Sequence, residues 1–438
     1  MEVGNLLVSF LQTIVEKILK MLARFTIWRY QPVVVGITGS MGKTSTREAI
    51  YYVLKNNFGV RRSIKNYNHK LGLPLSILGL ESGGKSLPGW IWIFFKSFFS
   101  LFLSRKKYPE VLILEIGIEQ PGDMSYLASI AKPHIGVVTG IGEIPVHVEF
   151  FNSPEALARE KSQLIKILGK KDFAVLNNDD SLVAEMRNKT KARVLTFGLE
   201  ESADVMAEKI GFNYSFNDRE LLGISFKISR QGNTVPFRLK GTLGSHQLYP
   251  VLAAIAVGEI LELNLVQMAD AILDFRAPAG RMRLLSGIKN SFVIDDTYNA
   301  SPTATQKAVE TLKNIPVSGK KIAVLGDMLE LGVYTEKAHR KIGRLAFEAA
   351  DIFVAVGQRM KFAYEEARQV GFAKENSYWF SDANEAKKKV EELVDPDDLI
   401  LVKGSQGMRM ERIVLEIMAE PDKADELLVR QDAKWKRN

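Results

Sequence analysis

The hydrophobic and polar positions of this chain alternate in blocks. Short apolar runs rich in β-branched residues, typical of buried strands, are separated by stretches with helical spacing. The first run, VVVGITG, follows Pro32, and the spacing behind it predicts a helix from Thr44 to Lys55. Further strands are predicted at Val111–Leu114, Ile135–Thr139, Ala174–Leu176 and Val194–Phe197, and a further helix at Pro154–Leu168. This alternation predicts a parallel sheet covered by helices on both faces.

The pattern changes over residues 198–242. The alternation in GISFKISRQGNTVPFRLKG predicts antiparallel strands with a turn at Gln231–Asn233, and a helix is predicted at His246–Leu263. A second α/β block starts near Arg281, after the hinge-like APAG of Ala277–Gly280. Its strands are predicted at Phe292–Ile294, Lys321–Leu325, Ile352–Val356 and Leu399–Val402. We therefore expect three parts: an N-terminal amphipathic helix over residues 1–32, a central domain over 33–279 and a C-terminal domain over 280–438.

Composition excludes several classes of protein. Of the 438 residues, 46% are hydrophobic, which excludes a mainly disordered chain. The 59 basic and 51 acidic residues give a net charge of +8, too mild at this length to indicate a nucleic-acid partner. There is no cysteine, so disulfides, zinc ribbons, iron–sulfur clusters and thiol nucleophiles are excluded. The chain start lacks the basic region of a secretory signal, and we expect a cytoplasmic protein.

Two apolar segments carry basic residues beside them. Within residues 1–30 one helical face is apolar and another carries Lys17, Lys20 and Arg24. Residues 85–107 contain WIWIFFKSFFSLFL, five basic residues and no acid. This combination indicates peripheral contact with the inner face of a membrane. The alternative is that the segments pack on each other, on the rest of the protein or across a dimer; the sequence does not indicate an oligomeric state.

The strongest local motif joins the first strand to the first predicted helix. It comprises Gly39, Ser40, Met41, Gly42, Lys43, Thr44 and Ser45. Backbone N–H groups at such a helix start hold phosphates, a lysine reaches the β- and γ-phosphates, and a Thr hydroxyl ligates magnesium. Position 37 is isoleucine, so only the second half of the full phosphate-loop spacing is present. We expect an α/β protein with a P-loop-type, doubly wound central domain and a Rossmann-like C-terminal α/β domain.

Three further residues are candidates for metal chemistry. Glu115 ends the apolar strand LILE, at the edge of a doubly wound sheet where ligands bind, and its carboxylate suits magnesium. His147 and Lys161 follow, the latter on the helix Pro154–Leu168. Taken singly, Glu115 is equally a cap or ion-pair partner, His147 a structural histidine and Lys161 a solvated lysine.

The second block carries polar residues after its strands. Arg281 precedes it, and Asp295, Asp296 and Asn299 follow its first strand, which suits a ribose, a metal or an incoming amine, or else a helix cap. Two further segments also follow predicted strands: GDMLELG with His339, and Lys-Gly-Ser at residues 403–405. The alternative interpretation of each is an ordinary turn between a strand and a helix.

Taken together and in this order, these segments resemble the Mur ligase family, specifically the branch that adds D-alanyl-D-alanine to a stem tripeptide. The matching segments are TGSMGKTS, NYNHKLGLPLS, LEIG, the stretch from Pro133 to His147, AREKSQLI, GRM, IDDTYNASP, VLGDMLELG with His339, and VKGSQGMRME. They span residues 33 to about 413. IDDTYNASP with VLGDMLELG is the most specific pair.

The resemblance implies the roles of the central-domain residues. Lys43 and Thr44 would handle ATP and its magnesium, with Glu115 and His147 as magnesium ligands. Lys161 would be carbamylated, which turns a cation into an anionic ligand for a second Mg²⁺.

The resemblance also implies how the remaining residues act. Arg281, Asp296 and Asn299 would close over the nucleotide, while Asn66, Asn68 and His69 would line the phosphate or substrate side. The implied partners are a nucleotide-linked peptide and a dipeptide.

The reaction implied is ATP-dependent amide formation through an acyl phosphate, releasing ADP and phosphate. Alternatives are a sibling ligase that adds another amino acid or glutamate to a peptide, polyglutamate or folate-type acceptor, a non-catalytic ATP-binding subunit, and a P-loop kinase or motor.

Two departures from the family pattern change what we expect. Only about 35 residues precede the phosphate loop, so we expect the family's UDP-gripping domain to be replaced by another surface or a partner. Gln247 and Pro250 stand where the family has two asparagines on the adenine side, so adenine contacts should differ.

Overall fold

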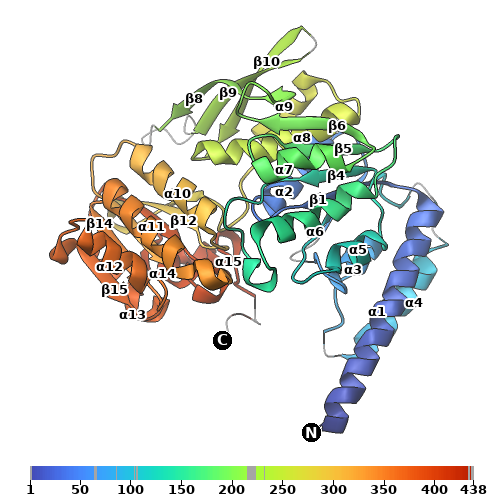
Figure 1. Ribbon diagram of the computed structural model, residues 1–438, viewed down its shortest axis with the longest axis horizontal. Helices are drawn as coiled ribbons and strands as arrows, with labels where there is room; N and C mark the ends of the chain where they lie inside the picture. The colour runs from blue at the N-terminus through green and yellow to red at the C-terminus, as the bar shows by residue number, and fades with distance from the viewer. Residues whose placement is uncertain are drawn as a thin grey trace.

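The computed structural model describes residues 2–63, 67–84, 86–102, 104, 107–214, 223–230, 232–432 and 435, and the side chains of these except at 2–12, 87 and 100. Two α/β lobes lie beside each other, and a pair of helices projects from the first lobe near the N-terminus (Figure 1). Asn66 lies outside the described residues.

The first lobe is built on a seven-stranded parallel sheet in the order β2-β3-β1-β4-β5-β6-β7. Its strands are β1 (Val33–Thr38), β2 (Val60–Arg62), β3 (Val111–Glu115), β4 (Ile135–Val138), β5 (Phe173–Asn177), β6 (Arg193–Gly198) and β7 (Val205–Met206). The five predicted strands are confirmed. The two that sequence reasoning missed, β2 and β7, are the short edge strands, where no buried run is required.

Helices cover both faces of this sheet, as its alternating side chains require. Val35 and Ile37 of β1 pack into one core with α2 (Lys43–Leu54), α8 (Leu248–Ile260) and α9 (Leu265–Leu273). Val34 points into the opposite core, formed with α3 (Gly72–Leu78), α5 (Asp123–Ala128) and α6 (Pro154–Lys166). The doubly wound central domain expected from the sequence is therefore confirmed.

A three-stranded antiparallel sheet, in the order β10-β9-β8, adds to the first lobe. Its strands are β8 (Glu208–Asn213), β9 (Gly223–Arg230) and β10 (Asn233–Lys240). Phe226 and Phe237 face each other across β9 and β10 and join the core of α8 and α9. The predicted antiparallel pair is confirmed, although Gln231 lies outside the described residues. The predicted helix after it is α8, preceded by a short 3₁₀ turn at Ser245–Gln247.

The second lobe has a six-stranded sheet in the order β11-β12-β16-β13-β14-β15. Its strands are β11 (Arg283–Ser286), β12 (Phe292–Asp296), β13 (Lys321–Gly326), β14 (Ile352–Val356), β15 (Ser377–Phe380) and β16 (Leu399–Lys403). Only β11 is antiparallel. Its helices are α10 (Pro302–Asn314), α11 (Thr335–Ala349), α12 (Lys361–Gln369), α13 (Ala383–Leu393), α14 (Glu411–Ile417) and α15 (Ala424–Leu427). The four predicted strands and the Rossmann-like α/β class are confirmed.

The two lobes are joined by the stretch between α9 and β11, which contains Ala277–Gly280. We propose the domain limits 1–32, 33–279 and 280–438 on this basis. Ahead of the first lobe, α1 (Glu2–Tyr30) lies beside α4 (Leu87–Ser100) (Figure 1). Among the described helices, none is both long and apolar enough to cross a bilayer.

Candidate active site

The loop between β1 and α2 has the backbone of a phosphate cradle. Gly42 precedes the helix with φ +79°, and Gly39 has φ +147°, both in the region that favours glycine. The backbone N–H groups of Ser40 and Met41 donate to the carbonyl of Gly140, at 2.7 and 3.2 Å. Ser40 Oγ is buried without a hydrogen-bond partner. The helix start and this free hydroxyl suit an incoming anion.

Gly39→Ala should weaken nucleotide binding strongly. A Cβ at Gly39 would lie 2.0 Å from Thr139 Oγ1, so the loop would have to move. We expect affinity for a non-hydrolysable ATP analogue, measured by calorimetry, to fall about 100-fold, as expected from about 3 kcal/mol of strain. Gly232→Ala is the control, because Gly232 also has a positive φ but no atom near its Cβ position. Equal affinity in Gly39→Ala and the wild type would contradict this loop geometry.

Two lysines meet at one carbonyl in this loop. Lys43 Nζ donates to Gly39 O at 2.8 Å, and Lys161 Nζ donates to the same oxygen at 3.0 Å. Burial lowers the pKa of both amines, and for Lys161, which is only 2% exposed, the neighbouring Lys43 lowers the pKa further. The pKa of Lys161 therefore lies well below its usual value. An uncharged amine is a nucleophile, which is the form that reacts with carbon dioxide.

Lys161 reaches the loop because of how α6 starts and packs. Ser153 caps the helix by accepting from the N–H of Ala156, and Pro154 occupies its first turn. Leu157 and Leu164 lie on the buried face of α6, and Lys161 shares it, four residues after Leu157. A lysine on this face is therefore not the solvated residue that the simpler interpretation favours.

Thr44 and Glu115 form the second pair of the site. Thr44 Oγ1 donates to Glu115 Oε2 at 3.1 Å and lies 3.3 Å from Oε1, joining the start of α2 to the end of β3. Arg47, one turn further along α2, approaches the same carboxylate at 3.4 Å. A hydroxyl beside a carboxylate is a donor set that magnesium accepts.

Arg281 brings the second lobe to this pair. Its Nη2 lies 3.4 Å from Thr44 Oγ1, and its guanidinium lies over the ring of Tyr298 at 3.8 Å. The Nε of Arg281 is buried without a hydrogen-bond partner. An arginine held in this way at a phosphate loop is suited to bind phosphate.

Asp296 and Asn299 lie at the end of β12, near Arg281. Asp296 Oδ2 accepts from Lys403 Nζ at 2.6 Å, and its Oδ1 accepts from the N–H of Met282 at 3.2 Å. Lys403 Nζ also donates to the carbonyl of Asn299 at 3.0 Å. Both Asp296 and Asn299 line the cavity between the lobes, and their roles toward a nucleotide stay predictions.

Asp295 should make stability depend on pH. It is fully buried and burial raises its pKa to about 6, although Thr297 and the N–H of Gly280 donate to it. The folded state then binds a proton more tightly than the unfolded state. The contribution of Asp295 to the free energy of unfolding is therefore largest below pH 4 and is lost as pH rises through 6. We expect it to lower the free energy of unfolding by up to about 3 kcal/mol between pH 4 and 7.

Denaturant titrations across this range test the prediction. Asp295→Asn should flatten the pH dependence, whereas Asp274→Asn, at an exposed position, should leave it unchanged. Identical slopes in the wild type and Asp295→Asn would contradict the assignment.

His147 pairs with a carboxylate of the second lobe. It has a left-handed backbone with φ +66°, and its Nδ1 lies 2.5 Å from Glu330 Oε2 of the second lobe. The pKa of Glu330 is lowered by this histidine. Among the described residues, no three His, Asp or Glu side chains are grouped so as to hold a metal. A ligand role for His147 stays a prediction; the pairing through Nδ1 leaves Nε2 as the nitrogen that could bind a metal.

His339 has a structural position. It is fully buried, its Nε2 accepts from the N–H of Met328 at 3.1 Å, and its Nδ1 lies 2.7 Å from the carbonyl of Thr335. It holds the GDMLELG loop in place. Ser405 Oγ accepts from the N–H of Leu329 at 2.9 Å and supports the same loop.

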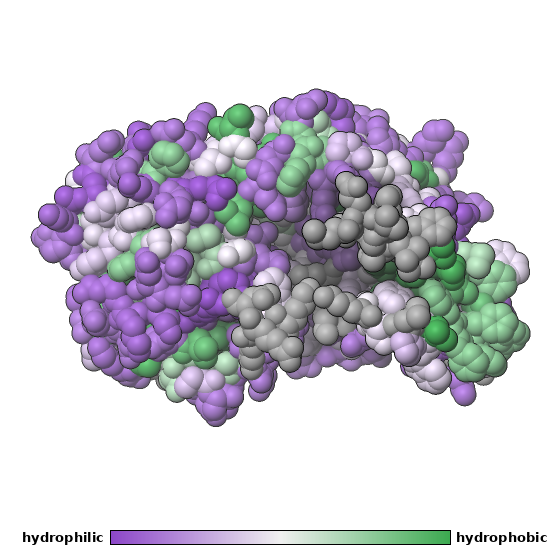
Figure 2. Space-filling model, turned by 90° about the horizontal axis from the view of Figure 1, so that it is seen from below, coloured by the Kyte–Doolittle hydropathy of each residue, from purple (hydrophilic) through white to green (hydrophobic). Residues whose placement is uncertain are grey.

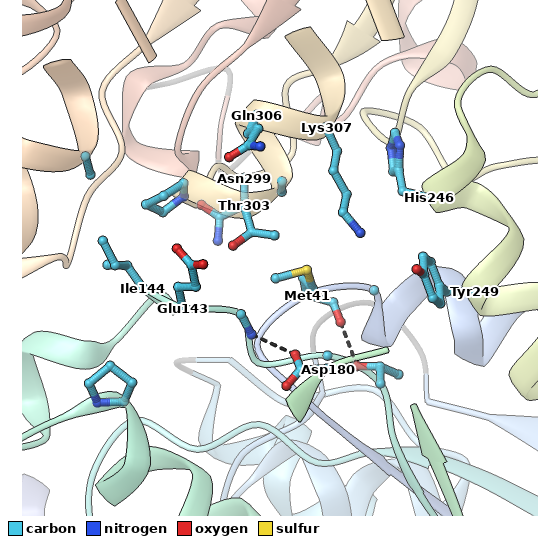
Figure 3. Close-up of a pocket in the computed structure, with 18 of the residues that line it drawn as sticks. Met41, Glu143, Ile144, Asp180, His246, Tyr249, Asn299, Thr303, Gln306 and Lys307 are labelled. Carbon is cyan, nitrogen blue, oxygen red and sulfur yellow. Dashed lines mark hydrogen bonds between the residues drawn. The ribbon is translucent and has the colours of Figure 1, made fainter. Parts of the chain in front are cut away.

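A cavity of about 1420 Å³ opens between the lobes. Met41, Gly42 and Ser45 of the phosphate loop line it, together with Arg281, while Lys43, Thr44, Glu115, His147 and Lys161 are not among its lining residues. Figure 3 shows Thr303, Gln306 and Lys307 of α10 on one side, with Met41 and Asp180 opposite and Tyr249 and His246 at one end.

Sequence reasoning missed several residues of this cavity. Asp180 accepts from the N–H groups of Ile141 and Gly142, and Tyr249 donates to Asp179 at 2.9 Å (Figure 3 shows Asp180 and Tyr249). Arg47 was also missed, although its place one turn after Thr44 on a helix that starts at a phosphate loop is a usable signal. The contact between Asp179 and Tyr249 carries no local signal, because it joins elements far apart in the chain.

Comparisons with known proteins identify similar sequences. Residues 97–258 match the Mur ligase middle domain, and residues 280–406 match the Mur ligase glutamate ligase domain. The UDP-N-acetylmuramoyl-tripeptide–D-alanyl-D-alanine ligase of Mycobacterium leprae is 30% identical over 86% of this chain and 71% of its own. The chain belongs to the Mur ligase family. The enzyme of the same name from Bacillus subtilis is 28% identical over 89% of this chain and 76% of its own.

Solved structures of the family extend the match. The structure of MurF from Acinetobacter baumannii has a TM-score of 0.75 at 25% identity and covers 91% of this chain and 79% of that one. That of MurF ligase from Thermotoga maritima in complex with ADP has a TM-score of 0.72 at 26% identity, covering 92% and 83%. This Mur ligase is therefore an ATP-dependent ligase by family.

The family's expected magnesium site fits this chain in part. Thr44 and Glu115 are in place as oxygen donors, whereas Lys161 offers magnesium no oxygen atom and would do so only as a carbamate. The departure at Gln247 and Pro250 also has a structural counterpart. Gln247 Oε1 is buried without a hydrogen-bond partner, and both Gln247 and Pro250 line the cavity. That the adenine contacts of this Mur ligase differ from the family pattern stays a prediction. Asn68 and His69 use their backbone carbonyls to accept from the N–H groups of Gly117 and Leu73.

Proposed function

We propose that this Mur ligase adds D-alanyl-D-alanine to the stem tripeptide of a nucleotide-linked cell-wall precursor, consuming ATP. The observation that carries the proposal is the convergence of Lys43, Lys161, the Thr44–Glu115 pair and Arg281 on one phosphate loop. The names of the similar enzymes support the choice of substrates.

The phosphate loop and its neighbours hold ATP in this proposal. Backbone N–H groups at the start of α2, Ser40 Oγ and Lys43 bind the phosphates, and Arg281 contributes positive charge from the second lobe. Thr44 and Glu115 would hold Mg²⁺, and a bound Mg²⁺ would neutralise phosphate charge during transfer. Positioning and charge neutralisation are the main tasks in phosphoryl transfer, and these residues supply both.

Lys161 has a separate role. Its uncharged amine would add to carbon dioxide, forming an N–C bond and releasing one proton, and the carbamate would then offer an anionic oxygen ligand to a second Mg²⁺. The lowered pKa and the deep burial of Lys161 favour this reaction, because an ammonium group could not react and bulk water is kept away.

Amide formation then proceeds in two steps. A carboxylate oxygen of the tripeptide attacks the γ-phosphorus, the bond to the β-phosphate oxygen breaks, and ADP leaves. The amine of D-alanyl-D-alanine attacks the carbonyl carbon of the acyl phosphate, phosphate leaves with the former carboxylate oxygen, and the amine loses a proton. Activation is required because a free carboxylate is a poor acyl donor.

A panel of amines tests this function. With ATP, magnesium and UDP-linked tripeptide, we expect D-alanyl-D-alanine to give a new amide, identified by mass, with equal amounts of ADP and phosphate. Glutamate in its place should give none. Product with glutamate alone would show a sibling ligase, and ATP hydrolysis that ignores the amine would exclude the proposal. Because ATP and nucleotide-linked precursors are cytoplasmic, we propose that the ligase works in the cytoplasm.

A further inference from the structure

The outer side of α1 and α4 is unusually apolar. More than half of the large hydrophobic side chains that are exposed among the described residues lie on these two helices or directly after α4. The aromatic face, as we name it, comprises Met21, Phe25 and Trp28 of α1 with Ile91, Trp92, Phe95, Phe98, Phe99 and Phe102. Figure 2 shows the apolar surface gathered at this end of the molecule. Contiguous apolar patches of this kind mark interaction sites.

The aromatic face is not needed to hold the two helices in place. Leu19, Leu22 and Ile93 point inward and form a buried cluster with residues of α3 and the turn that follows it. Phe25 and Trp28 lie on the opposite side of α1, and Trp92, Phe95 and Phe99 repeat at helical spacing on the outer side of α4. The helices therefore pack on each other and on the first lobe, which is one of the alternatives that the sequence left open. They still expose a second face, and contact of that face with a membrane stays a prediction.

The aromatic rings of α4 form a contiguous row. The tilted rings of Phe95 and Phe99 have centroids 4.3 Å apart, and Phe98 and Phe102 continue the row at 5.4 Å. Trp28 and Trp92 are 67% and 62% exposed. Tryptophan at the edge of an apolar face is typical of side chains that sit at the boundary of a bilayer.

The charges around the aromatic face select its partner. Lys17, Arg24 and Arg29 are exposed on α1, and Lys96 and Lys107 are exposed on or just after α4. Glu16 is the only acidic residue from 13 to 30, and none occurs from 85 to 107. A second copy of this chain would bring like charges together, whereas an anionic surface would be complementary.

We propose that the aromatic face seats α1 and α4 in the headgroup region of an anionic lipid bilayer, at the inner face of the membrane, so that the ligase works as a peripheral membrane protein. The aromatic rings enter the apolar boundary and the five basic residues meet lipid phosphates. This proposal is independent of the ligase chemistry, because neither ATP nor acceptor is required for it.

Vesicle co-sedimentation of the full chain tests the proposal. We expect binding to vesicles of phosphatidylglycerol and phosphatidylcholine, weaker binding to phosphatidylcholine alone, and weakening by salt. The variant Trp92→Ser/Phe95→Ser/Phe99→Ser should bind at least about tenfold more weakly, because three apolar anchors are removed. The control Val266→Ser/Leu273→Ser, at exposed apolar positions of α9, should bind as the wild type.

Two further readouts keep the test independent of the variant's folding. Tryptophan emission of the wild type should be quenched by vesicles with brominated acyl chains. In sedimentation velocity without lipid, the wild type and the triple variant should show the same oligomeric state. The proposal would be overturned if the wild type did not bind anionic vesicles, or if the triple variant bound them equally well. It would also be overturned, in favour of a second copy of the chain, if the wild type formed a dimer that the triple variant does not form.

Discussion

Lys161→Ala should abolish amide formation, and short carboxylic acids such as acetate or propionate should restore part of it. We expect kcat to fall at least about 10³-fold, because the variant lacks the side chain that would supply an anionic ligand to the second Mg²⁺. A small carboxylate can enter the space left behind and replace the carbamate oxygen atoms. The measurement is the rate of phosphate release with ATP, UDP-linked tripeptide and D-alanyl-D-alanine, with and without added acid.

The control for this prediction lies on the same helix. Lys166→Ala changes an exposed lysine of α6, so it should retain wild-type activity and show no response to added acids. Full activity of Lys161→Ala without additives would remove Lys161 from the mechanism. Loss without rescue, together with loss of the thermal transition, would show a structural lysine instead.

Glu115→Gln should cause the second large loss of activity. The amide keeps the size of the side chain but removes the negative charge beside Thr44 Oγ1, so Mg²⁺ would be held poorly. We expect kcat to fall about 10²- to 10³-fold at ordinary magnesium concentrations, with partial recovery at high magnesium. Phosphate release measured over a magnesium titration checks both parts of this expectation.

Glu48→Gln is a matched control for this variant. Glu48 lies next to Arg47, which it binds at 2.9 Å, and it also pairs with Arg62 at 3.2 Å. Its replacement removes a carboxylate from the same arginine without touching Thr44. Equal losses in Glu48→Gln and Glu115→Gln would indicate that charge balance around Arg47, and not a magnesium ligand, explains the effect.

The sequence predicted the buried strands and the phosphate loop, because each of these is encoded by a short run of neighbouring residues. Strands such as β1 and β3 are fully covered by helices, so their apolar runs are continuous and easy to find, and Glu115 is placed by its position at the end of β3. The phosphate loop is likewise a local motif between a strand and a helix. The edge strand β2, with the sequence VRR, has no such run.

The rest of the site depends on contacts between distant elements. Lys161 meets Gly39 across 122 residues, and nothing in the spacing of α6 alone indicates that contact; the family resemblance pointed to it. The pairing of His147 with Glu330 depends on how the two lobes face each other, which no local pattern encodes. The same holds for Lys403, which binds Asp296 from the neighbouring strand β16.

The central claim is that the acceptor's carboxyl group is phosphorylated and then captured by an amine. The most direct test is the mass of the phosphate released when the carboxylate of the tripeptide carries ¹⁸O in both positions. We predict that each amide formed is accompanied by one phosphate bearing one ¹⁸O atom, with ADP as the other product. Unlabelled phosphate, or AMP and diphosphate in place of ADP and phosphate, would contradict it.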